Sequence, residues 1–389
     1  MIDVAIIGAG PAGCAAANIL ADRGFKVIVL EKDKLPRHKH CGGGISLRCV
    51  KALNKLDVNI EEVSLQDYKG FTLSYKELMA KSNLGQTIGW GVYRADFDNL
   101  LAKSAIYNGA RVCQSKVNGF KDENGRIKIF TDSCVRDVQI LFGADGIRST
   151  VRKELGIEYK ENKIGFCLES EVQATSNNIE EFNDLLHLDF SYLKDGYSWA
   201  FPKKQGHTIN IGIGGYLKSI QDSGFSLEEL LTIFARSHNI PINPDEIHGA
   251  LLPFGGTVDC FGKSNTILLG DAAGLASPLT GEGIPYALES GIIAANCATK
   301  FFEEQIPLVK SYTKAIEPLS REINDYALTL QNRMFGSDAH RRHIVKMCTS
   351  NDYFTETVSK IFTHIIPYEE GVKRLSTVRL LPSIIKGGI

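Results

Sequence analysis

The sequence lacks paired cysteines, an excess of charge and long hydrophobic runs, and each absence excludes a class of protein. Its nine cysteines include no C-x-x-C pair, so neither a thiolate zinc site nor a cysteine-ligated iron–sulfur cluster is expected, and free thiols indicate a reducing compartment. A formal net charge of −1 provides no basic field for nucleic acid. We therefore expect no metal and no nucleic-acid partner.

No apolar stretch reaches the roughly 18 residues that a membrane-spanning helix needs. The chain also opens directly into an apolar strand, without a basic leader or a cleavage site, which predicts a cytoplasmic protein. Glycine, in contrast, is abundant at 37 of 389 residues. This content indicates many tight turns, and the length favours more than one structural lobe.

Residues 8–13 read G-A-G-P-A-G between an apolar strand and an alanine-rich helix, and a second apolar strand ends at Glu31. In such a unit Gly8 permits the turn, Gly10 lets the backbone approach a pyrophosphate at the helix N-terminus, and Gly13 lets helix and strand pack closely. Glu31 is placed to accept a hydrogen bond from a ribose hydroxyl. The unit predicts a bound dinucleotide without choosing between NAD and FAD.

Two later segments favour FAD. Asp145 lies in G-A-D-G-I-R-S-T-V-R and Asp271 lies in G-D-A-A-G, each after an apolar strand. With the glycine turn they resemble the three fingerprints of the flavoprotein family of aromatic hydroxylases and their relatives. The resemblance implies that Asp145 lies near the pyrophosphate and that Asp271 binds the ribityl hydroxyls. Taken singly, each aspartate is also explained as a helix N-cap.

The segment P-L-T-G-E-G-I at 278–284 leads into a long helix predicted over 283–301. The N-terminus of this helix would stabilise negative charge on a reduced flavin, with Gly283 and Ile284 as backbone donors. A capping loop that uses glycine for a sharp turn explains the same residues.

Two further motifs narrow the resemblance. Residues 37–44 read R-H-K-H-C-G-G-G and residues 197–202 read Y-S-W-A-F-P. Together they resemble the geranylgeranyl reductase branch of the superfamily, over most of residues 1–300. In that branch a C-G-G-G element lies beside the flavin and a Y-x-W-x-F-P motif lies in the substrate lobe.

The physical sense of these motifs can be stated separately. Tyr197, Trp199 and Phe201 alternate along a strand and face one side of it, which suits an apolar substrate, although ordinary sheet core explains the same pattern. Cys41 is followed by glycines that let it approach a flat ring, although most free cysteines are small buried hydrophobes.

The remaining contacts follow from the resemblance by position: Arg94 begins a predicted helix, and Val117 falls on the strand whose backbone meets the adenine. We predict Cys41 and Tyr197 as catalytic residues, and Tyr197, Trp199 and Phe201 as substrate contacts. The predicted cofactor-binding residues are Gly8, Gly10, Ala12, Gly13, Glu31, Lys32, Cys41, Gly42, Gly44, Arg94, Val117, Asp145, Asp271, Gly283 and Ile284.

The predicted fold is α/β, and α+β overall, with a Rossmann-like FAD-binding domain, an inserted antiparallel-sheet substrate domain and a helical C-terminal region. These parts comprise residues 1–68, 90–160 and 250–305, residues 69–89 and 161–249, and residues 306–389. Residues 372–381 mix basic and apolar side chains, so they could rest on a bilayer surface or pack on the body of the protein.

The resemblance implies an FAD-dependent reductase that saturates carbon–carbon double bonds of a polyprenyl chain or lipid, with a proton from Cys41, a tyrosine or water. No second nucleotide fold is evident, so ferredoxin, another carrier or transiently docked NAD(P)H supplies electrons. One alternative is a flavin monooxygenase or halogenase, although halogenases have W-x-W-x-I-P where this chain has Y-S-W-A-F-P. Another is a catalytically silent flavin protein with Cys41 as a sensor thiol.

Overall fold

The N-terminal strand β1 (Ile2–Ile7) lies inside a sheet of eight strands in the computed structural model, which describes residues 2–123 and 125–377. It pairs in parallel with β2 (Val27–Glu31) and with β11 (Val135–Gly143). Its inner residues are fully buried, as expected where helices cover both faces of a parallel sheet. The other strands of this sheet are β8 (Arg111–Gln114), β9 (Val117–Glu123), β10 (Arg126–Thr131), β17 (Gly262–Lys263) and β18 (Thr266–Leu268).

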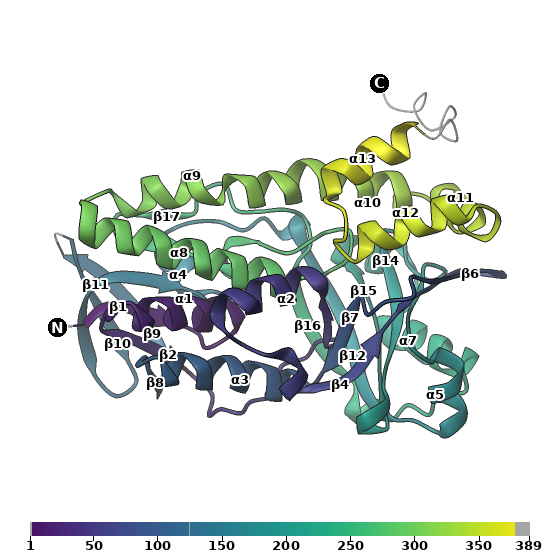
Figure 1. Ribbon diagram of the computed structural model, residues 1–389, viewed down its shortest axis with the longest axis horizontal. Helices are drawn as coiled ribbons and strands as arrows, with labels where there is room; N and C mark the ends of the chain where they lie inside the picture. The colour runs from purple at the N-terminus through teal and green to yellow at the C-terminus, as the bar shows by residue number, and fades with distance from the viewer. Residues whose placement is uncertain (1, 124, 378–389) are drawn as a thin grey trace.

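Two helices of this domain run parallel to each other, as Figure 1 shows for α1 (Pro11–Asp22) and α8 (Ile284–Glu304). A Cβ on Gly291 of α8 would lie 2.3 Å from the carbonyl oxygen of Ala12, so the two backbones touch. Further along, Arg23 at the end of α1 bonds to Asn296 and Thr299 of α8. Both N-termini therefore lie at the same end of the sheet. Additional helices here are α3 (Arg94–Tyr107), α4 (Thr150–Glu154) and α9 (Leu308–Arg321).

A second sheet of seven strands is antiparallel except where β13 and β5 pair. Helices α5 (Ser176–Phe182) and α7 (Leu227–Ser237) cover one of its faces over a separate apolar core (Figure 1). A capping box at Ser226 and Glu229 begins α7. The strands, in spatial order, are β16 (His248–Pro253), β12 (Ile164–Gln173), β15 (Thr208–Tyr216), β14 (Gly196–Lys203), β13 (Leu185–Asp189), β5 (Gly70–Tyr75) and β6 (Leu78–Asn83).

A small three-stranded sheet and helix α2 (Leu47–Leu53) join the two larger sheets. Its strands are β3 (Gly44–Ser46), β7 (Gly89–Val92) and β4 (Ser64–Tyr68). The seven-stranded sheet draws its strands from residues 70–83 and 164–253, so β16 crosses the boundary predicted at residue 250. The division of the chain into domains stays a prediction.

The C-terminal part is helical, and a short π-helical segment at Glu322–Ala327 continues α9. Phe335 stacks on Phe190 with ring centroids 4.2 Å apart, which anchors these helices to the seven-stranded sheet. The helices are α10 (Leu328–Phe335), α11 (Asp338–Ser350), α12 (Asp352–Phe362) and α13 (Tyr368–Thr377). Together these features confirm the predicted mixed α/β fold with a helical C-terminal region.

Two expectations about membranes bear on this region. Within residues 2–123 and 125–377, every helix is too short or too polar to cross a membrane. Of the segment 372–381 that could rest on a bilayer, residues 378–381 lie outside the described residues.

Candidate active site

The glycine turn after β1 leaves space at one position and none at another. A Cβ on Gly13 would lie 2.0 Å from the carbonyl oxygen of Gly8, so a side chain there is excluded by the backbone. At Gly10, the N-cap of α1, the only described atom within 4 Å of such a Cβ is an Arg37 nitrogen at 3.9 Å. Gly10 thus leaves open space at the N-terminus of α1, where the first amides have no partner within the helix, and this arrangement fits a pyrophosphate.

Glu31 ends β2 beside this turn and is only 5% exposed. Its Oε2 accepts a hydrogen bond from the Ala9 amide at 2.9 Å and lies 3.3 Å from Nε of Arg37, while Oε1 accepts from the Asp33 amide at 3.2 Å. Glu31 therefore fixes the glycine turn, and its predicted contact with a ribose stays a prediction. Lys32 points outward, with its side chain 69% exposed.

A buried chain of charges runs from Glu31 towards Cys41. Arg37 donates to Oδ2 of Asp98 at 2.9 Å, and Asp98 in turn accepts two hydrogen bonds from Arg94, at 2.9 and 3.0 Å. Burial disfavours the charge on Arg94, but the Asp98 carboxylate outweighs burial and raises the Arg94 pKa, and the Cys41 thiol lies beside the guanidinium. Arg94 begins α3 as predicted, and Asp98 holds its side chain. Asp98 was not predicted, although its i,i+4 spacing from Arg94 is visible in the sequence.

Asp145 and Asp271 follow neighbouring parallel strands, β11 and β18. Asp145 accepts hydrogen bonds from the amides of Thr150 and Val151 at 2.7 and 3.2 Å, but the N-cap of α4 is Ser149 and not Asp145. Its Oδ1 is buried and has no partner in the described chain, and burial raises the Asp145 pKa. This unpartnered atom leaves one carboxylate oxygen available to a ligand.

Asp271 meets the N-terminus of α8. Its Oδ1 would lie 3.2 Å from a Cβ on Gly283, the N-cap of α8, and Ile284 is the first residue of that helix. A Cβ on Gly270 would in turn lie 3.2 Å from the side chain of Ala12 in α1. The first and third fingerprints thus lie side by side, with a carboxylate and two helix N-termini. Val117 begins β9, three residues after the Gln114 that pairs with Glu31.

The C-G-G-G loop lies against the aromatic strand β14. A Cβ on Gly42 would lie 2.9 Å from the Phe201 ring and 3.2 Å from Nε1 of Trp199, while the Gly43 amide donates to Sγ of Cys41 at 3.5 Å. Trp199 donates to Oδ1 of Asn210 at 2.8 Å, which fixes its ring on the sheet. The structure therefore brings together two motifs that stand about 155 residues apart in the sequence.

Gly42→Ala should separate these motifs. The new methyl group would overlap the Phe201 ring, so we expect a loss of about 1–3 kcal/mol in the free energy of unfolding, measured with urea. Gly44→Ala is the matched control, because its Cβ would meet the same ring at an ordinary 3.7 Å and should cost no more than about 0.5 kcal/mol. Equal losses for the two variants would contradict this contact.

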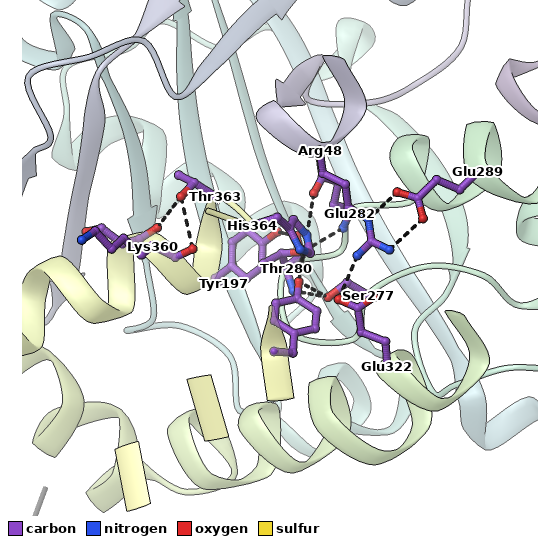
Figure 2. A network of polar contacts seen from close by, with 12 residues as sticks. Arg48, Tyr197, Ser277, Thr280, Glu282, Glu289, Glu322, Lys360, Thr363 and His364 are labelled. Atoms are coloured by element: carbon purple, nitrogen blue, oxygen red, sulfur yellow. Dashed lines mark hydrogen bonds and ion pairs between the residues drawn. The ribbon is translucent and has the colours of Figure 1, made fainter. Parts of the chain in front are cut away.

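A network of polar side chains behind Tyr197 was not predicted (Figure 2). Tyr197 donates its hydroxyl hydrogen bond to the carbonyl oxygen of Thr280 in the loop before α8. Nε2 of His364 lies 3.1 Å from Oε2 of Glu282 and 3.1 Å from the Tyr368 hydroxyl, which is 2.8 Å from Oγ of Ser277. The C-terminal helices thus hold the loop at residues 277–283.

Arg48 connects α8 with the π-helical segment on the other side of this region. It forms ion pairs with Glu289 of α8 at 2.6 Å and with Glu322 of the π-helical segment at 2.9 Å (Figure 2). Its guanidinium also lies over the Tyr286 ring. Burial raises the pKa of both Tyr197 and Tyr368, and the Glu282 carboxylate adds to the effect. Both hydroxyls consequently keep their protons at neutral pH.

Known proteins resemble this chain in sequence and in fold. The FAD binding domain family matches residues 1–301. Menaquinone reductase of Mycobacterium tuberculosis is 31% identical over 75% of each chain, and digeranylgeranylglycerophospholipid reductase of Methanococcus vannielii is 29% identical over 77% of each. The structure of a geranylgeranyl bacteriochlorophyll reductase-like protein of Thermoplasma acidophilum is 25% identical, with a TM-score of 0.79 over 96% of this chain and 98% of that one.

Proposed function

The chain belongs to the FAD binding domain family, and on this premise we propose that it is an FAD-dependent reductase that saturates carbon–carbon double bonds in the polyprenyl chain of a lipid. The contact between the Cys41 loop and the aromatic face of β14 carries the proposal, because it joins a cofactor motif to an apolar surface. Menaquinone and digeranylgeranylglycerophospholipid, for which the relatives are named, both bear polyprenyl chains.

The residues of the turn and of the two aspartate motifs would hold the cofactor. The α1 N-terminus and the space at Gly10 suit the pyrophosphate, and Asp271 with the α8 N-terminus suits the ribityl and flavin end. When reduced, FAD supplies a hydride. The N-terminus of α8 also favours negative charge at the flavin.

The substrate would lie along Tyr197, Trp199 and Phe201, whose rings exclude water from the double bond. An isolated alkene accepts hydride poorly, so a proton must lead or accompany the transfer. Cys41 and Tyr197 are the proposed donors. The Tyr197 proton is held towards the Thr280 carbonyl, which favours the Cys41 thiol as the first donor.

The function is tested by reducing the FAD-loaded protein without oxygen and adding a geranylgeranyl lipid. We expect the flavin to reoxidise and mass spectrometry to show the lipid heavier by two hydrogens for each bond reduced. Reoxidation that requires oxygen and gives a hydroxylated or halogenated product would instead identify a monooxygenase or halogenase. No reoxidation by polyprenyl lipids would favour the silent redox protein.

The electron donor and the place of action belong to the same proposal. We propose that ferredoxin or NAD(P)H reduces the flavin, and that the protein works in the cytoplasm and touches membranes peripherally to reach its lipid. Adding each donor under the same anaerobic conditions identifies the one that reduces the flavin at a useful rate.

Tyr368→Phe should slow turnover about 3- to 10-fold while FAD stays bound, because the loop at residues 277–283 loses a hydroxyl shared by Ser277 and His364. Rates of flavin reoxidation in single turnovers provide the measurement. Tyr312→Phe is the matched control: Tyr312 is equally buried and donates to the Leu268 carbonyl at 3.0 Å, away from this loop. An unchanged rate in Tyr368→Phe would remove the network from the mechanism.

A further inference from the structure

A second cluster of titratable side chains lies in the core beneath α5 and α7, on the face of the seven-stranded sheet opposite the aromatic residues. His187 of β13 pairs directly with Ala200 of β14. Residues paired across two strands point to the same side, so His187 lies on the Ala200 side while Trp199 and Phe201 lie on the other. Asp189 shares the side of His187, and His238 at the end of α7 closes over both.

Several buried polar atoms around Asp189 lack hydrogen-bond partners. Asp189 pairs in register with Ser198 on one side and with Ser74 on the other. Oγ of both serines and Nε2 of His187, which is 3% exposed, find no partner among the described residues. Native cores rarely leave such atoms unpaired, and three on one patch indicate that something else binds there.

The free atoms of the cluster are of the kinds that bind metal ions in proteins. His187, Asp189 and His238 each offer one ligand atom, and the three atoms lie within 4.8 Å of one another. Oδ1 of Asp189 is already used by the Ser191 amide at 2.8 Å, which leaves Oδ2. Nδ1 of His238 lies 2.8 Å from Oε1 of Glu181, an outer carboxylate that orients the ring and leaves Nε2 for a ligand.

The surroundings of the cluster favour a bound cation. His238 caps the C-terminus of α7, where the helix dipole attracts positive charge. The phenyl rings of Phe182 and Phe234 pack around the two histidines and shield the cluster from water.

We propose that His187, Asp189 and His238 form a binding site for a divalent first-row transition ion, Zn²⁺ or Fe²⁺. Two imidazoles and one carboxylate are a ligand set that both ions accept, with water in the remaining positions. The wide spacing of the cysteines argues against a thiolate zinc site, but a site made of histidine and aspartate ligands needs no cysteine. The site is separate from the flavin site and does not depend on the proposed reductase activity.

The site is tested on the FAD-loaded full chain made without a histidine tag. We expect about one equivalent of zinc or iron per chain by elemental analysis after growth with both metals. Stripping with a chelator and adding Co²⁺ should restore ligand-field absorption typical of nitrogen and oxygen ligands, and Zn²⁺ should raise the melting temperature of the stripped protein. For the iron form, exposure of the Fe²⁺ protein to nitric oxide should give the electron paramagnetic resonance signal of a ferrous adduct.

Substitutions of the proposed ligands test where the ion binds. His187→Gln and Asp189→Asn should each weaken Co²⁺ binding at least 10-fold, whereas His207→Gln, an exposed histidine of the same lobe, should leave it unchanged. The titration of the unaltered protein needs no variant and so decides the question even if a core substitution prevents folding. Absence of stoichiometric metal, together with absence of a Co²⁺ signal in the unaltered protein, would overturn the proposal and indicate that ordered water fills the cluster.

Discussion

Gly10→Val should fold normally and fail to bind FAD. The Gly10 backbone is extended, which suits a β-branched residue, and the position faces open space. Valine would occupy that space above the α1 amides, where the pyrophosphate is proposed to lie. We expect the dissociation constant for FAD to rise at least 100-fold, which corresponds to about 2.7 kcal/mol, while the unfolding free energy of the apoprotein changes by less than about 1 kcal/mol.

Gly13→Val provides the contrast, since its Cβ would collide with the Gly8 carbonyl oxygen at 2.0 Å. That variant should lose about 3 kcal/mol of stability with or without flavin. Flavin fluorescence titration and urea unfolding of both variants separate the two effects. Normal FAD binding by Gly10→Val would show that the dinucleotide does not lie at this turn.

Cys41→Ala should slow reoxidation of the reduced flavin by a geranylgeranyl lipid about 10²- to 10³-fold if its thiol delivers the proton. The thiol lies beside the buried Arg94 guanidinium and accepts a hydrogen bond from the Gly43 amide, so the loop holds it in place. Anaerobic single-turnover rates give the measurement, and photoreduction of the flavin without lipid should stay unchanged.

Cys167→Ala is the matched control for Cys41→Ala. Cys167 is a residue of β12 and lies near Cys41. Its thiol, however, is buried and donates to the Ala250 carbonyl at 3.5 Å. Burial raises the Cys167 pKa to about 12, which makes it a poor acid at neutral pH. A larger rate loss in Cys167→Ala than in Cys41→Ala would reassign the donor, and unchanged rates in both would leave Tyr197 or water.

The sequence was most informative where one short segment both forms an element and carries a motif. The glycine turn and the alternating aromatic residues of β14 depend on residues within about five positions, so spacing alone predicted them. The contact between Gly42 and Phe201 was not predicted, because the resemblance put one motif beside the flavin and the other in the substrate lobe without joining them. Its geometry depends on the three-stranded sheet that links the lobes.

The interactions that the sequence did not predict join segments far apart in the chain. Arg48 pairs with Glu289 and Glu322, and His364 pairs with Glu282, yet each residue taken alone looks like an ordinary charged or polar side chain on a helix or loop. These side chains pair because they are buried next to one another, and this burial results from the tertiary packing of the C-terminal helices. The cluster at His187 escaped notice for the same reason, because His238 stands 51 positions further along the chain.

The close fit of α8 against α1 has a consequence for how the protein is made. The dinucleotide turn is finished within the first 31 residues, but β18, Asp271 and the helix that touches Ala12 lie between residues 266 and 304. At roughly 5–20 residues per second, a ribosome needs about 14–55 s to extend the chain from residue 31 to residue 304. The nascent turn therefore lacks its α8 partner for most of synthesis, and we expect flavin to bind only after residue 304 has been added.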